Sequence, residues 1–102
     1  MKINVFGENI TVTSAIEDYI NDKFSHLYKP EKLTQADFRI GSTKTDKYVH
    51  FYAHTPKEDL VIKTSDKDLY HAFDSIMHKI HLAFTKEKQK NNSKSPNPNK
   101  II

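Results

Sequence analysis

Apolar and polar side chains alternate in four short stretches of this chain, and an alternation with a period of two predicts β-strands. In the first stretch Ile3 and Val5 share one face, and Gly7 lies at the exit. In the third, Val49 and Phe51 share one face, while tyrosines and histidines take the other. A short polar connector separates the last two stretches, which favours a hairpin. The predicted strands cover residues 2–7, 33–41, 48–55 and 59–64.

Between the first two strands the period changes to three and four residues, which predicts an amphipathic helix. Thr13 or Ser14 is expected to cap its N-terminus, and Ser14 with Glu17 has the spacing of a capping box. Pro30 is expected to end this helix. Its apolar stripe consists of Ile16, Ile20, Phe24 and Leu27.

The helical period returns in residues 68–90 and predicts a second helix. Ser65 or Asp66 is expected to cap it, and acidic residues in its first turn suit the helix dipole. Its buried stripe is expected to contain Leu69, Phe73, Ile76, Ile80, Ala83 and Phe84.

The order β-α-β-β-β-α predicts an α+β fold with a four-stranded mixed sheet and both helices packed on one face. Each strand has one apolar face and each helix one apolar stripe, so the two layers can bury these surfaces against each other. A helical crossover makes the first two strands parallel. The uncovered face of the sheet is expected to carry Arg39, His50, Tyr52, His54 and Lys63.

The length of 102 residues suits one domain with a modest core. We assign residues 1–90 to this domain and residues 91–102 to a disordered basic tail, because the tail is polar and contains two prolines without periodicity. The chain has no cysteine, which excludes disulfides and thiolate sites. No apolar run suggests a membrane span, and the first residues do not resemble a signal peptide. The expected location is the cytoplasm.

Positive charge is concentrated near the C-terminus. Residues 86–102 hold five lysines and one acid, which gives +4, so the other residues sum to −1 in a chain of net charge +3. Such a block can bind phosphates by releasing counterions. It can equally serve only to keep the chain in solution.

The histidines and glycines do not form a recognisable catalytic or metal site. His78 and His81 have the spacing of zinc ligands on a helix, but no further ligand is evident, so no metal is expected. Gly7 and Gly41 are the only glycines, too few for a phosphate-binding loop. The serines lack the context of a nucleophile elbow. We therefore expect no enzyme, no cofactor and no small-molecule substrate.

Two surfaces remain as candidates for contact with RNA. Tyr52 and its neighbouring histidines on the open sheet face can stack bases, although no ribonucleoprotein-type motif accompanies them and an ordinary exposed surface is the favoured interpretation. The second surface is basic. Lys79, Lys86 and Lys90 follow one flank of the second helix, and Lys23 follows a flank of the first. We expect these flanks to meet in one basic groove that offers lysine head groups to phosphates.

Four stretches resemble the short ribosome hibernation-promoting factors and the related ribosome-associated inhibitor proteins. They are INVFGENITVTSAIEDYINDKFSHL, LTQADFRI, VHFYAHTPKEDLVIKTSDKDLYHAFDSI and HKIHLAFTKEKQK, which together span about residues 1–90. The most specific part combines Asp68, Leu69, Tyr70, Ala72, Asp74 and Lys79 with the later Lys86, Lys88 and Lys90.

The resemblance implies a fold similar to a double-stranded-RNA-binding domain with an extra N-terminal strand. It also implies binding to the small ribosomal subunit in the channel used by messenger and transfer RNA, with inhibition of translation in stationary phase or stress. A second small modulation factor is an implied partner for ribosome dimers, and no membrane is implied. The implied rRNA contacts are Lys23, Lys79, Lys86, Lys88 and Lys90, with His26 and His78 as auxiliary contacts.

Some positions differ from the family pattern. His26 stands where a lysine is usual, Leu82 where the family often has arginine, His78 where an acid or amide is usual, and Phe73 where an aliphatic is usual. The long members carry a further C-terminal domain, and this chain is expected to be a short member of the promoting type. The alternative left open is a general module for structured RNA that acts away from the ribosome.

Removal of residues 91–102 should leave the melting temperature nearly unchanged, because this segment offers no periodic apolar set for the core. Thermal unfolding of the shortened chain, followed by circular dichroism, measures this. A large drop would show that Ile101 and Ile102 pack on the domain.

Overall fold

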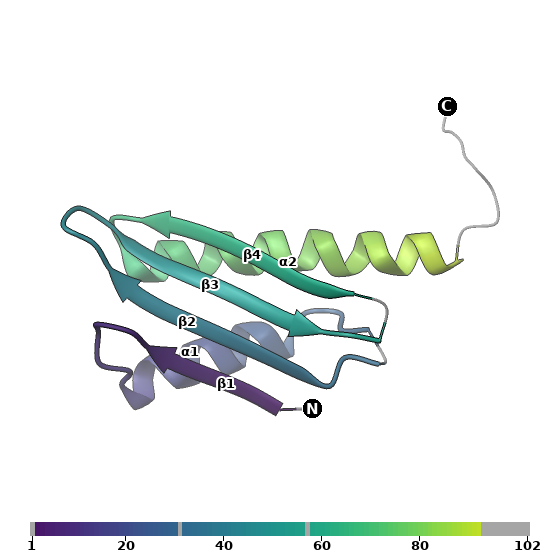
Figure 1. Ribbon diagram of the computed structural model, residues 1–102, viewed down its shortest axis with the longest axis horizontal. Helices are drawn as coiled ribbons and strands as arrows, with labels where there is room; N and C mark the ends of the chain where they lie inside the picture. Colours follow the sequence, from purple (N-terminus) through teal and green to yellow (C-terminus); the bar gives the residue numbers. More distant parts are fainter. Residues whose placement is uncertain (1, 31, 57, 93–102) are drawn as a thin grey trace.

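The computed structural model describes residues 2–30, 32–56 and 58–92, with side chains as far as residue 86 (Figure 1). Six elements follow one another in the predicted order, so the α+β prediction is confirmed. They are β1 (Lys2–Gly7), α1 (Ser14–Ser25), β2 (Gln35–Ser42), β3 (Lys47–His54), β4 (Asp59–Asp66) and α2 (Leu69–Asn92).

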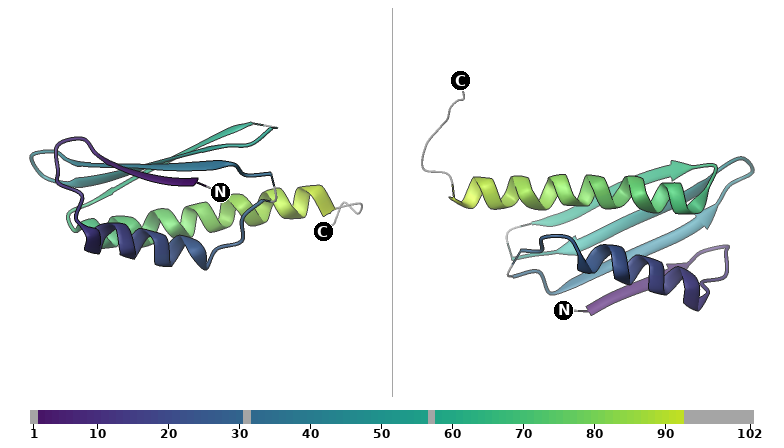
Figure 2. Two further views of the ribbon diagram at one scale, coloured as in Figure 1. Left: turned by 90° about the horizontal axis from the view of Figure 1, so that it is seen from below. Right: turned by 180° about the vertical axis from the view of Figure 1, so that it is seen from behind.

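The four strands form one mixed sheet in the order β1-β2-β3-β4. β1 runs parallel to β2, while β2 with β3 and β3 with β4 are antiparallel. The parallel pair follows from α1, which carries the chain back across the sheet. Seen from below in Figure 2, both helices lie on one side of the sheet, and the other side is open. Seen from behind, α1 lies over β1 and β2, and α2 lies over β3 and β4.

An aromatic cluster occupies the centre of the core. The ring of Phe24 lies 5.7 Å from that of Phe38, 5.9 Å from that of Phe51 and 6.4 Å from that of Phe84, measured between centroids. All four side chains are at most 2% exposed. The predicted stripes are largely confirmed, although Leu27 and Ala83 are only half-buried. The other buried hydrophobic residues of the described part of the chain are Ile16, Ile20, Leu33, Ala36, Ile40, Val49, Ala53, Leu69, Ala72, Phe73, Ile76, Met77 and Ile80.

The first helix begins as predicted and ends earlier than predicted. Thr13 caps it, because its Oγ1 accepts a hydrogen bond from the backbone nitrogen of Ile16. The helix ends at Ser25 with His26 as C-cap, so Pro30 is not its terminator. The ammonium of Lys29 satisfies the last carbonyls instead, donating to the oxygens of Phe24, Ser25 and Leu27.

The predicted cap of the second helix was wrong. Asp68 caps it, since its side chain accepts from the nitrogen of Tyr70 and its carbonyl from that of Ala72. Ser65 and Asp66 belong to β4, where pairing with β3 occupies them, and the first turn of α2 contains no acid.

The far end of α2 includes Asn91 and Asn92, which the sequence analysis assigns to the tail. Residues 93–102 lie outside the described residues. Within the described range, neither helix is long and apolar enough to cross a membrane.

Replacement of Phe24 by alanine should destabilise the domain by about 3–5 kcal/mol, the usual cost of such a cavity. Unfolding in denaturant measures the loss. Leu82→Ala is the matched control, because Leu82 is 53% exposed and its loss should cost no more than about 0.5 kcal/mol. Similar losses in the two variants would contradict the assignment of Phe24 to the centre of the core.

Candidate nucleic-acid interface

The two helices meet at a polar and aromatic junction. The Tyr19 hydroxyl of α1 donates a hydrogen bond of 2.6 Å to the Asp74 carboxylate of α2. The ring of Tyr19 also packs edge-on against Tyr70, at 4.9 Å, and lies 5.9 Å from Phe73. The hydrogen bond to Asp74, helped by partial burial, raises the pKa of Tyr19 to about 12. This junction therefore fixes which flank of α2 faces α1.

Lys23 lies beside the junction. It is one turn after Tyr19, and its ammonium is 5.4 Å from the centre of the Tyr19 ring. The aromatic face attracts the cation, and the lysine is exposed to solvent. Lys23 is thus held at the junction of the two helices with its charge available to an external anion.

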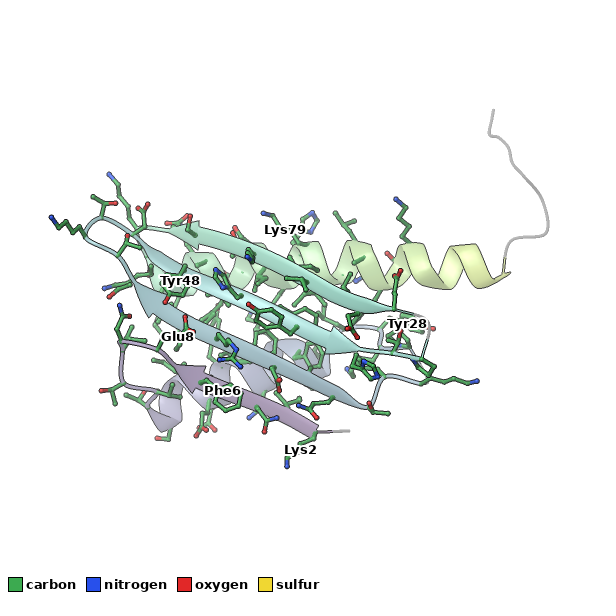
Figure 3. The ribbon with its side chains drawn as sticks, in the orientation of Figure 1. Lys2, Phe6, Glu8, Tyr28, Tyr48 and Lys79 are labelled. Carbon is green, nitrogen blue, oxygen red and sulfur yellow. The ribbon has the colours of Figure 1, made fainter. Side chains whose placement is uncertain are left out.

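Lys79 lies on the other flank of α2, so the predicted single groove was wrong. Its ammonium is 3.5 Å from the Lys63 carbonyl of β4. Figure 3 shows Lys79 beyond β4, at the edge of the sheet far from α1. At 100° per residue, Lys79 is rotated by about 140° from Asp74, the residue that contacts α1. Periodicity located the lysine beside the apolar stripe, but it could not identify which neighbour that flank would face.

The other predicted contacts are distributed along the helices. Lys86 is exposed and lies two turns after Lys79 on the same flank. Lys88 and Lys90 belong to the last turns of α2, and their side chains lie outside the described residues.

His26 is exposed and donates from Nδ1 to the carbonyl of Asp22 at 2.7 Å. His78 is exposed on α2. In the described part of the chain, no group of three potential ligands could hold a metal ion.

The open side of the sheet carries an organised aromatic surface. Arg39 lies over the rings of Phe6 and Tyr52, at 5.2 and 5.7 Å from their centres. Tyr48 donates to the Glu8 carboxylate at 2.7 Å, and Figure 3 shows Phe6, Glu8 and Tyr48 on this side. The sequence prediction for this face omitted Phe6, although the alternation of β1 places it opposite Ile3 and Val5.

Gly41 allows Tyr48 to lie flat on the sheet. A β-carbon at position 41 would be 2.2 Å from the Tyr48 hydroxyl oxygen and 2.3 Å from the ring carbon that bears it. The ring therefore crosses β2 toward Glu8 in a space that only glycine leaves open.

Comparison with known proteins identifies the family. A family model described as "Sigma 54 modulation protein / S30EA ribosomal protein" matches residues 3–92. A relative from Azotobacter vinelandii, named ribosome hibernation promoting factor, is 25% identical over 91 residues, which cover 88% of this chain and 85% of the relative.

Two solved structures share the fold. A ribosomal subunit interface protein from Coxiella burnetii superposes with a TM-score of 0.81 and 19% identity, covering 86% of this chain and 98% of that one. The N-terminal domain of Protein Y from Thermus thermophilus gives a TM-score of 0.75 and 22% identity, covering 84% and 98%. At these identities the two structures support the architecture alone.

The hydrogen bond between Tyr19 and Asp74 should couple the two helices by about 1 kcal/mol. A double-mutant cycle with Tyr19→Phe and Asp74→Ala, followed by denaturant unfolding, isolates this energy. Because folding raises the pKa of Tyr19 from 10.0 to about 12, its contribution should be complete below pH 10 and decline as the pH rises toward 12. Strictly additive losses in the cycle would contradict the coupling.

Proposed function

The chain belongs to the family described as sigma 54 modulation protein and S30EA ribosomal protein, and from this membership we propose that it is a ribosome hibernation factor. The relative from Azotobacter vinelandii carries that name. In this proposal the protein binds the small ribosomal subunit in the channel used by messenger and transfer RNA. Translation stops because the channel is occupied, without a chemical step. The site of action is the ribosome in the cytoplasm.

The exposed lysines of the two helices support this proposal. Lys23 lies at the junction of the two helices, and Lys79 lies on the outer flank of α2. A protein that fills a channel meets nucleic acid at more than one place, so lysines at two separate places of the helix layer suit an enclosed site better than a single RNA strand in one groove. Lysine stems lie along the helix while the ammonium groups reach the phosphates.

The remaining contacts belong to the same proposal. Lys86 extends the flank that begins at Lys79, and Lys88 and Lys90 are predicted to continue phosphate contact along α2. His26 and His78 are auxiliary contacts that become stronger when histidine is protonated. Ribosome dimerisation with a second small factor is a prediction that rests on the resemblance alone.

Sedimentation with small ribosomal subunits tests the proposal. The wild-type protein should sediment with vacant subunits at low salt and inhibit translation in a cell-free extract. The triple variant Lys23→Ala, Lys79→Ala, Lys86→Ala should lose both properties and keep its melting temperature. Each lost phosphate contact should lower the slope of log affinity against log salt by about 0.7–0.9, as for simple nucleic acids.

A matched triple variant separates a specific surface from net charge. Lys2, Lys32 and Lys44 are exposed and lie outside both helices, so their replacement by alanine removes the same charge from other places. This control should sediment nearly as wild type does. Equal losses in both triples would contradict the site assignment. Wild-type protein that stays at the top of the gradient, yet binds free duplex RNA, would favour a general RNA-binding module instead.

A further inference from the structure

Two neighbouring rows of side chains cross the open face of the sheet from edge to edge. The strand register places them side by side, about 6.8 Å apart along the strands. One row contains the two cations Arg39 and Lys63, and the other contains the half-buried ring of Tyr52. The rows are Phe6–Arg39–His50–Lys63 and Asn4–Asp37–Tyr52–Val61.

A depression of about 340 Å³ opens beside Tyr52. Its wall includes the ring of Tyr52 and the side chain of Val61, which is 50% exposed. Asp37 and Asp59 supply carboxylates at its border, and His54 pairs with Asp59 at 2.5 Å. The depression thus combines an aromatic wall, an apolar patch and hydrogen-bond acceptors.

The aromatic groups around the depression are held in place before any ligand arrives. The rings of Tyr48 and His50 lie 4.9 Å apart, and those of His50 and Tyr52 lie 6.5 Å apart, so they form a ladder along β3. Arg39 covers the edge of this ladder at Tyr52. Desolvation, together with the nearby Lys63, lowers the pKa of His50. His50 is therefore a neutral ring at neutral pH, suited to stacking.

The charges on this face favour a base over a run of phosphates. Asp37 and Asp59 repel phosphate at the depression. Asp37 already accepts hydrogen bonds from Asn4 and Gln35, and Asp59 pairs with His54, but the remaining lone pairs of the carboxylates can accept from the amino groups of bases.

Arg39 and Lys63 lie in the adjacent row, where the phosphate of the same nucleotide can reach them. Arg39 is 3.9 Å from the Glu8 carboxylate, so a phosphate would compete with Glu8 for its charge. Arg39 is also the only arginine in the chain, and a guanidinium can stack on planar groups as a lysine cannot.

We propose that the open face of the sheet binds an unpaired RNA nucleobase, which enters the depression and stacks on Tyr52 while Arg39 and Lys63 bind its phosphate. The inference rests on the proposed function only in taking RNA as the partner. It adds a second contact surface, on the opposite side of the molecule from the helices. Base–aromatic stacking tolerates all four bases, because each has a π-face.

Nuclear magnetic resonance of the ¹⁵N-labelled full chain tests the proposal with hexa-adenylate as the probe. The amide signals of Tyr52, His54 and Val61 should shift with hexa-adenylate and stay in place with tripolyphosphate, which offers phosphates without bases. Shifts confined to the helices, or equal open-face shifts with tripolyphosphate, would overturn it. Open-face shifts that grow with protein concentration in the absence of RNA would overturn it in favour of a second copy of the chain.

Substitutions at the depression give a second measurement. Tyr52→Phe keeps the ring and should bind hexa-adenylate within about twofold of wild type. Tyr52→Leu should weaken binding at least tenfold, and tenfold corresponds to about 1.4 kcal/mol, within the range of one base–aromatic stack. Val61→Glu, at a position that is 50% exposed on the open face of β4, should also weaken binding. Equal affinity of Tyr52→Leu and Tyr52→Phe would exclude stacking.

Ribosome sedimentation distinguishes failure of the proposed base site from failure of the proposed hibernation function. Wild-type protein that fails to sediment with small subunits, yet shows the open-face shifts, would contradict the hibernation role and leave the base site standing. Wild-type protein that sediments, while Tyr52→Leu sediments equally well and hexa-adenylate shifts no open-face signal, would contradict the base site alone.

Discussion

The ring of Phe24 packs against one phenylalanine from each of β2, β3 and α2, and the placement of both helices on the sheet depends on this contact. Protein interiors are close-packed, so a cluster of four large rings leaves little freedom for either helix to shift. α2 lies over β3 and β4, and α1 over β1 and β2 (Figure 2). The narrow junction between the helices is closed by Tyr19 and Asp74. Because this flank of α2 faces α1, Lys79 lies on the outer flank, against β4.

The same packing leaves one side of the sheet without a cover. Aromatic residues on an open face need polar partners, and here they have them. Tyr48 reaches Glu8 across Gly41, and Arg39 lies over Phe6 and Tyr52. These contacts place rings in fixed orientations on a surface that water can reach. The aromatic surface is thus a consequence of putting both helices on the other side.

Sequence periodicity was sufficient for the elements and their layers, because each buried face repeats with its own period. It predicted the open-face positions Arg39 and Tyr52 for the same reason. It could not identify Asp68 as the cap of α2, since Ser65, Asp66 and Asp68 all accept hydrogen bonds and only strand pairing excludes the first two. It could not place Lys79 against β4, because a helical stripe defines a flank without defining the neighbour of that flank. Arg39 lies over the rings of Phe6 and Tyr52 only because of the register between β1, β2 and β3. The alternation of residues within one strand does not determine that register.

The two sides of the molecule, the helix layer and the open face of the sheet, carry different cations. The chain has 16 basic residues other than histidine, of which Arg39 is the one arginine. Lysine is a compact charge on a flexible stem, which suits phosphates that differ in position, and lysines occupy the flanks of the helices. Arginine is planar and stacks, and the single arginine lies among the rings of the open sheet. With a net charge of only +3, the protein has little general attraction for polyanions, since that attraction grows with the number of phosphates neutralised. Under the proposed function, selective binding to RNA has to come from where these few cations lie: lysines at the helix junction and on the outer flank of α2, and an arginine beside a ring that can receive a base.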